Sequence, residues 1–145
     1  RSKIALSTIE PQIDPIGAVV GVKGVRIGSV SKQLHGENID CVEFSTIPEM
    51  FIARALSPAL VNSVKIEKHP TYGEKGKAIV TIPSDQKSKA IGKAGLNIRL
   101  ASMLTKYDIE LVEVASLSTS TVNSNEKNIS EDKSADTASL EALFK

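Results

Sequence analysis

Hydrophobic and polar residues alternate in two stretches of the chain, residues 39–44 and 109–114, which predicts a half-buried strand in each. A segment with apolar residues at helical spacing precedes each strand, at residues 25–34 and 96–107. A pair of glycines precedes each of these helical segments in turn. The order of glycine turn, helix and strand therefore occurs twice, and such an internal repeat indicates one structural unit used twice.

Further elements are predicted before the first glycine pair. Residues 1–8 alternate as a strand does, and Asp14 and Pro15 suit the start of a short helix over residues 16–20. Because the chain opens directly on a strand and does not begin with Met, we expect its native start to lie upstream of residue 1.

Residues 47–115 follow the order helix, strand, strand, helix, glycine turn, helix and strand. The apolar stripe of the first of these helices is predicted at Phe51, Ala55 and Leu56, and the Ser84-Asp85 pair is predicted to cap the second. Such a unit would bury one face of a three-stranded sheet under three helices.

The two glycine turns have the same spacing, Gly-x-x-Gly, and lie 71 positions apart at residues 21–24 and 92–95. Glycine allows a sharp turn and a close approach of the backbone to a bulky group such as a phosphate. A helix that begins at the turn adds backbone N–H groups and the positive end of its dipole. One such tetrapeptide commonly marks an ordinary loop, so the weight of the argument rests on the repeat.

Carboxylates are absent around both turns, between Asp14 and Glu37 and between Asp85 and Asp108. All charged side chains in these windows are cationic, and they are Lys23, Arg26, Lys32, Lys87, Lys89, Lys93, Arg99 and Lys106. A solvated basic helix face would explain one window, whereas two equal windows around equal turns favour an anionic ligand.

The net charge of +1 hides an uneven distribution, with 15 basic and 12 acidic side chains in residues 1–115 but three basic and five acidic ones in residues 116–145. The latter segment is rich in Ser, Thr, Asn and charged residues, and we expect it to be disordered. Its last residues, 139–145, form a short amphipathic patch that is either a frayed end or a helix that docks on a partner.

Several classes of site are disfavoured by composition. Aromatic residues make up 3% of the chain and Trp is absent, which counts against a sheet surface on which bases stack. The single Cys41 and the isolated His35 and His69 offer no metal-ligand spacing, so we expect no metal and no cofactor. Without an apolar run long enough to span a membrane or a leader sequence, we expect a cytoplasmic protein.

Catalytic patterns are also missing from the sequence. Gly92-Lys93 lacks the earlier glycine and the following Ser or Thr of a phosphate-binding P-loop, and no nucleophile and base are paired. We therefore expect a protein that is not an enzyme.

The glycine turns with their flanking helices resemble the KH domain, whose G-x-x-G loop clamps four nucleotides of single-stranded RNA. Two stretches, DPIGAVVGVKGVR with GENID and AIGKAGLNIRLA, are similar to the tandem KH pair of the NusA family of bacterial transcription elongation and termination factors. Leu96 stands where that family usually has glutamine. The resemblance covers residues 1–115.

This resemblance implies an α+β fold with two tandem KH domains of the prokaryotic type, type II. The first domain would comprise residues 1–46 and lack its opening helix and strand, the second residues 47–115, and the disordered tail residues 116–145. It implies binding of nascent single-stranded RNA during pausing, termination and antitermination. RNA polymerase would be bound mainly through an N-terminal domain absent from this sequence, and other antitermination factors are further candidate partners. We expect a monomer that does not bind membranes.

We expect each turn to lie along the RNA backbone, with cationic side chains neutralising phosphates and bases lying over Ile27 and Ile98. The candidate RNA-binding residues are Gly21, Val22, Lys23, Gly24, Arg26, Ile27, Gly92, Lys93, Ala94, Gly95, Asn97, Ile98 and Arg99. Three alternatives stay open, namely a duplex nucleic-acid binder, a protein–protein docking module and, least favoured, a nucleotide-handling enzyme.

Overall fold

A computed structural model describes residues 1–115, and residues 1–114 form one compact unit. The expected disorder of residues 116–145 and the amphipathic patch at their end lie outside the described residues. The elements are β1 (Ser2–Leu6), α1 (Pro15–Val20), α2 (Val25–Gln33), β2 (Ile39–Glu43), α3 (Pro48–Ala55), β3 (Ser63–Lys68), β4 (Gly76–Pro83), α4 (Lys87–Ile91), α5 (Leu96–Thr105) and β5 (Tyr107–Val114).

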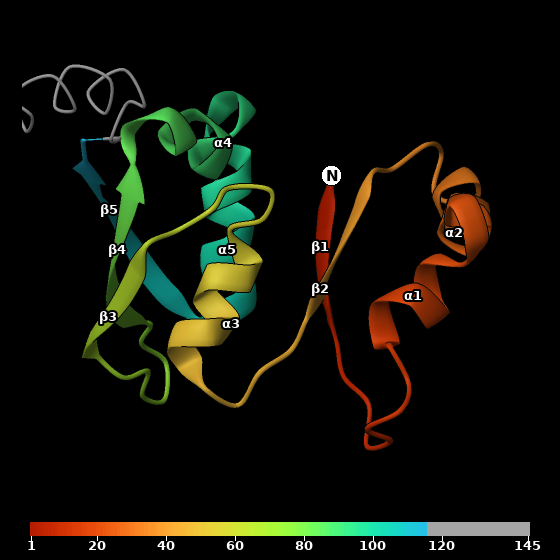
Figure 1. The fold of residues 1–145 in the computed structure, drawn as a ribbon, viewed down its shortest axis with the longest axis horizontal. Coiled ribbons are helices and arrows are strands. Elements are labelled where there is room, and N and C mark those ends of the chain that lie inside the picture. The colour runs from red at the N-terminus through yellow and green to blue at the C-terminus, as the bar shows by residue number, and fades with distance from the viewer. Residues whose placement is uncertain (116–145) are drawn as a thin grey trace, which may run out of the picture. The chain divides into compact units, whose positions relative to one another are not determined.

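The same four-element motif occurs in both halves of the described chain (Figure 1). A strand, two helices and a second strand follow one another as β1-α1-α2-β2 and again as β4-α4-α5-β5, and the two strands of each motif pair in parallel. The second half adds α3 and the strand β3, which pairs antiparallel with β4 to give the sheet order β3-β4-β5. The α+β class and the repeat of one unit are thereby confirmed.

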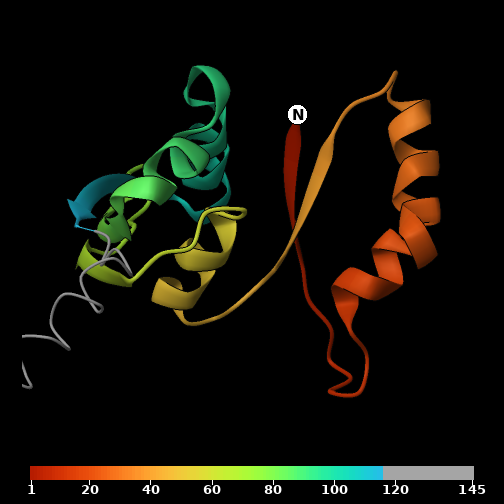
Figure 2. The ribbon, with the colours of Figure 1, turned by 45° about the horizontal axis from the view of Figure 1, so that its top comes forward.

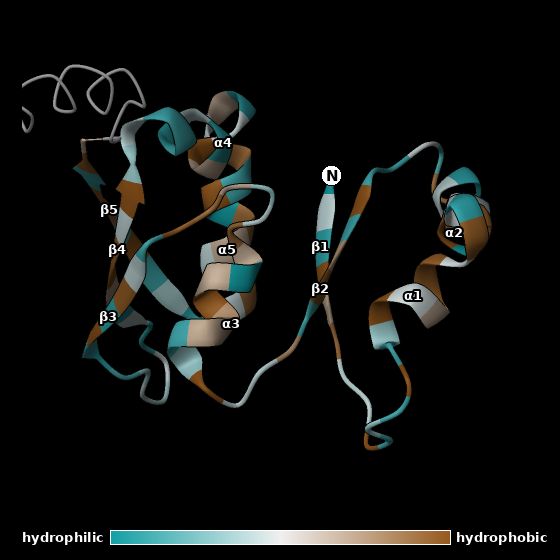
Figure 3. Cartoon of the chain, in the orientation of Figure 1, coloured by the Kyte–Doolittle hydropathy of each residue, from teal (hydrophilic) through white to brown (hydrophobic). Residues whose placement is uncertain are grey.

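Helices cover one face of the three-stranded sheet, whereas the β1-β2 pair contacts α1 and also α3 and α5. Figures 1 and 2 show α3 and α5 on the same face of the β3-β4-β5 sheet, and α1 and α2 together on one face of the β1-β2 pair. Hydrophobic and hydrophilic residues alternate along β3 and along most of β5 (Figure 3), because successive side chains point to opposite faces. On β4 the residues that face the helices are buried and those between them are more exposed.

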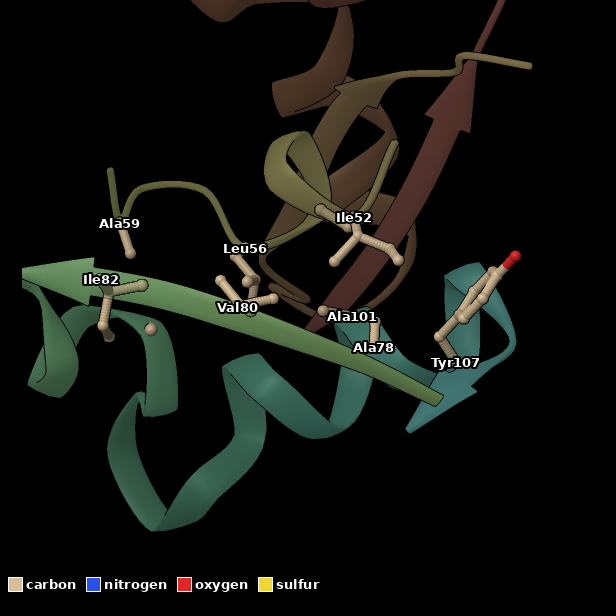
Figure 4. Close-up of a cluster of buried hydrophobic side chains, with 10 residues drawn as sticks. Ile52, Leu56, Ala59, Ala78, Val80, Ile82, Ala101 and Tyr107 are labelled. Atoms are coloured by element: carbon tan, nitrogen blue, oxygen red, sulfur yellow. The ribbon is translucent and has the colours of Figure 1, made fainter. Parts of the chain in front are cut away.

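The hydrophobic core lies in the second half, between α3, α5 and the three-stranded sheet (Figure 4). Ile52 of α3 and Leu56, the residue directly after α3, pack there with Val80 and Ile82 of β4. All four side chains are fully buried. The predicted stripe on α3 is correct for Ala55 and Leu56 but omits Ile52. In the first half of the described chain Val42 and Pro15 are the buried apolar residues, and both lie outside this core cluster.

The predicted helix cap at Ser84 and Asp85 is wrong. These residues form a 3-10 turn, Ser84–Gln86, before α4 begins at Lys87, and no side chain caps α4. The Ser84 hydroxyl instead donates a hydrogen bond to the carbonyl oxygen of Val114, at 3.2 Å. The polar side chain thus joins the ends of β4 and β5, which lie side by side in the parallel pairing.

Lys3 of β1 is buried, with 1% of its side chain exposed. Its Nζ donates to the carbonyl oxygen of Ser57 at 2.9 Å and lies 3.8 Å from a carboxylate oxygen of Asp40. Burial lowers the pKa of Lys3, and Asp40 opposes part of this shift by favouring the charged form. The contact joins β1 to the chain that follows α3.

Cys41 is half-buried on β2, and burial raises the pKa of its thiol. None of the helices over residues 1–115 is long and apolar enough to cross a membrane.

Candidate nucleic-acid interface

The two Gly-x-x-Gly turns have the same backbone conformation. The first glycines, Gly21 and Gly92, have φ/ψ of 77°/171° and 74°/176°. The last glycines, Gly24 and Gly95, have φ/ψ of 73°/21° and 72°/15°. The sequence repeat is therefore a repeat of structure, residue by residue.

A non-glycine residue occupies the left-handed region in each turn. Lys23 has φ/ψ of 54°/25° and Ala94 has 58°/24°, at equivalent positions. Residues other than glycine rarely adopt this backbone conformation, and such strain concentrates at functional sites. Both side chains are exposed, so burial of these side chains does not explain the conformation.

Hydrogen bonds close each turn and leave its two middle N–H groups free. The N–H of Gly24 donates to the carbonyl of Gly21 and that of Gly95 to the carbonyl of Gly92, both at 3.1 Å. No acceptor within residues 1–115 takes the N–H groups of the two middle residues in either turn. Each turn therefore presents a pair of unpaired donors, which suits an anion.

Short helices position the turns. The carboxylate of Asp14 accepts a hydrogen bond from the N–H of Ile16 at 3.1 Å and so caps α1, as predicted from the Asp-Pro pair. α1 and α4 end where the first glycine begins, and α2 and α5 start directly after the last glycine. Neither α2 nor α5 has an acidic residue in its first turn, so the positive end of each helix dipole is not neutralised there.

The first glycine of each turn packs tightly against the following helix. A Cβ on Gly21 would lie 2.9 Å from Cγ of Arg26, and a Cβ on Gly92 would lie 2.7 Å from Cβ of Asn97. Gly95, by contrast, has no atom within 4 Å of such a Cβ. The first glycine is thus required by both close approach and conformation.

Cationic side chains near the turns are free of ion pairs within the described residues. Lys23, Lys93 and Arg99 are exposed and have no carboxylate partner. Lys87, a cation of the second window, is paired with Glu113 of β5, and away from the turns Lys68 pairs with Glu74 at 2.7 Å and Lys77 with Glu67 at 3.2 Å. Positive charge near both turns therefore remains available to a ligand.

Arg26 is exposed and its charge is not paired, but its Nη1 donates to the carbonyl oxygen of Ala18 at 2.7 Å. The side chain thus joins α2 to α1 across the first turn. Its guanidinium retains further N–H donors for a phosphate.

Asn97 lies inside the protein with 4% of its surface exposed. Its Nδ2 donates to the carbonyl oxygens of Leu56, Lys89 and Ala90 at 3.2, 3.2 and 2.9 Å. Its Oδ1 is buried and has no partner within the described residues. The side chain that we predicted as an RNA contact is therefore used within the protein.

The two isoleucines have different surroundings. Ile98 is half-buried and packs against the hydrophobic core of the second half. Ile27 lines a hollow of about 370 Å³ whose lining is mixed, with Ile16, Val20 and Ile39 on the apolar side and Arg1, Asp40 and Ser57 among the polar residues. Ile98 therefore contributes to the core and Ile27 borders the hollow, and the base-binding role of both residues stays a prediction.

The structure groups the predicted residues into two separate sets, one around each turn. No hydrogen bond or ion pair between the two sets is present in the part of the chain that the structure describes. Sequence reasoning missed the internal role of Asn97. The repeat offers one signal for it, because an offset of 71 aligns Asn97 with Arg26 and the acceptor residue Lys89 with Ala18. Among residues 1–115, no group of three or more His, Cys, Asp or Glu side chains could hold a metal ion.

Comparisons with known proteins give consistent results. Residues 1–44 match the NusA-like first KH domain and residues 48–119 the NusA-like second KH domain. The chain is 44% identical to the transcription termination/antitermination protein NusA of Helicobacter pylori (strain J99), across 100% of this chain and 40% of that protein. It is 47% identical to the NusA protein of Thermus thermophilus, across 78% of this chain and 28% of the relative.

A solved structure described as the crystal structure of APE1850 has a similar fold, with a TM-score of 0.56 and 23% sequence identity, covering 77% of each chain. Among the curated relatives, the chain spans about 40% of the length of the Helicobacter protein.

Proposed function

The chain belongs to the family of NusA-like tandem KH domains, and from this we propose that it binds single-stranded RNA as part of a transcription termination and antitermination factor. One observation carries the proposal. Two turns with equal backbone geometry each present two free N–H donors beside unpaired cations, in windows without carboxylates.

In this proposal the sugar-phosphate backbone of the RNA lies across each turn. The free N–H groups of the middle residues donate to phosphate oxygens, and the start of the following helix adds its dipole. Lys23, Arg26, Lys93 and Arg99 neutralise further phosphates, and the hollow beside Ile27 accepts a base. Asn97 is left out of the contacts because its side chain is buried.

Residues 1–46 and 47–115 act in this proposal as two RNA-binding units of a monomer. The rest of the factor is proposed to bind RNA polymerase through a region outside this sequence, together with other antitermination factors, in the cytoplasm. The family consists of transcription factors without enzymatic activity, and the proposal contains no catalytic step.

A titration with short single-stranded RNA oligomers of varied sequence, at two salt concentrations, tests the proposal. We expect saturable binding that weakens as salt rises, because neutralised phosphates release counterions. Duplex RNA should compete poorly. Equal competition by duplex would favour a duplex binder, and retention of proteins without RNA or salt dependence would favour a docking module.

Replacing Lys23 by Ala is expected to reduce the slope of log affinity against log salt by about 0.7 to 1 unit, since one phosphate contact is lost. Ala94 holds the same backbone conformation in the second turn, so K23A should preserve the first turn. K65A removes an exposed lysine of β3 and should leave the slope unchanged. An unaltered slope in K23A would remove Lys23 from the contacts.

A further inference from the structure

The residue five positions after the first glycine reaches back, in both turns, to the helix that precedes the turn. Arg26 donates from Nη1 to the carbonyl oxygen of Ala18, and Asn97 donates from Nδ2 to that of Lys89. The two acceptors are equivalent residues, since both acceptor and donor pairs are 71 positions apart. Two different side chains therefore make the same connection across the same turn.

The connection made by Asn97 is the more extensive one. Its Nδ2 also donates to the carbonyl of Ala90 in α4 and to that of Leu56, at the end of α3. The reverse orientation of the amide would point its oxygen at three carbonyl oxygens, so this arrangement is determined by electrostatics. A single buried side chain thereby links α3, α4 and α5.

The helix before the second turn needs such a connection. α4 has five residues, too few to be stable alone, and its last carbonyls have no partners within the helix. Asn97 donates to two of these carbonyls and packs directly against Gly92. Without it, the end of α4 and the turn would have to be ordered when a ligand binds, which weakens binding.

We propose that Asn97 and Arg26 are positioning residues that hold the two turns in the conformation that binds RNA. Asn97 acts from a buried position without touching RNA, whereas Arg26 combines this role with a charge that faces solvent. The inference rests on the proposed function, and it adds which residues prepare each site.

At Arg26, two variants separate the positioning role from the charge. R26A and R26N both remove the cation, so both should reduce the salt slope equally. Only R26N keeps a donor that can reach Ala18 as Asn97 reaches Lys89. We expect R26N to bind single-stranded RNA about fivefold more tightly than R26A, as one hydrogen bond predicts. Equal affinity of the two variants would overturn the positioning role of Arg26.

At Asn97, N97A should lower the affinity of the folded protein for RNA about tenfold, with an unchanged salt slope, because no phosphate contact is lost. The folded fraction is measured by circular dichroism and used to correct the affinity. A role in stability alone predicts an unchanged corrected affinity, and that result would overturn the proposal for Asn97. If N97A does not fold, the comparison of R26A with R26N still decides whether the side chain at this position of the repeat holds the turn in its binding conformation.

Hydrogen exchange separates failure of this inference from failure of the proposed function. The amides of Gly92 and Gly95 donate to Ser88 and Gly92, so their exchange reports on the end of α4 and on the second turn. Faster exchange of these two amides in N97A, relative to the core amide of Val80, supports the positioning role whether or not RNA binds. In the same way, R26A should speed exchange at the hydrogen-bonded amides of Gly21 and Gly24 more than R26N does. If the parent protein binds no oligomer, the proposed function fails, and unchanged exchange in these variants would refute the positioning role as well.

Discussion

Replacing Lys93 and Ala94 together by aspartate is expected to weaken binding of single-stranded RNA by at least about a hundredfold while the protein stays folded. Both side chains are exposed at the turn, and both N–H groups are free for a phosphate. Two carboxylates at this point repel the phosphate, and the cation of Lys93 is lost. Aspartate tolerates the left-handed conformation of Ala94 better than most residues do, so the turn should survive.

The measurement is an RNA titration combined with a circular-dichroism spectrum and a thermal melt. S63D combined with K65D is the matched control, because it makes the same change of net charge at exposed residues of β3. This control should retain most of the affinity. Equal losses in both double variants would show that total charge, rather than the second turn, governs binding.

The repeated unit could be predicted from sequence because its signals are local. Alternation over residues 39–44 and 109–114 gave two strands that the structure places at Ile39–Glu43 and Tyr107–Val114. The glycine spacing and the helical periodicity after it depend on neighbouring residues alone, and α2 and α5 begin where expected. Such patterns are formed by the backbone and need no knowledge of distant contacts.

Long-range partners explain what the sequence could not show. Asn97 is buried because it meets the carbonyl of Leu56, which is 41 residues away. Ser84 fails to cap α4 because its hydroxyl meets Val114, 30 residues away. Lys3 occupies an ordinary polar position in the pattern of a strand, but it is buried and its Nζ donates to the carbonyl oxygen of Ser57, after α3. In each case a polar side chain takes a partner that only the tertiary structure supplies.

The two glycines of one turn differ in what they require, although both have positive φ. Gly92 has φ/ψ of 74°/176°, in a region that is essentially restricted to glycine, whereas Gly95 at 72°/15° lies in the left-handed region that Ala94 also occupies. A Cβ on Gly92 would also lie 3.0 Å from the backbone nitrogen of Asn97, which cannot move without shifting α5. Around Gly95 there is open space.

Replacing Gly92 by Ala is therefore expected to destabilise the protein by about 3 kcal/mol, the sum of backbone strain and a contact that forces the turn away from α5. G95A should cost only about 1 kcal/mol, since it meets no neighbour and adopts a tolerated conformation. Urea denaturation followed by circular dichroism measures both values. In RNA titrations the folded fraction of G92A should bind more weakly than that of G95A, because the displaced turn no longer aims its free N–H groups at one phosphate. Equal destabilisation by the two variants would contradict the assignment of Gly92 as the residue on which the turn's close packing depends.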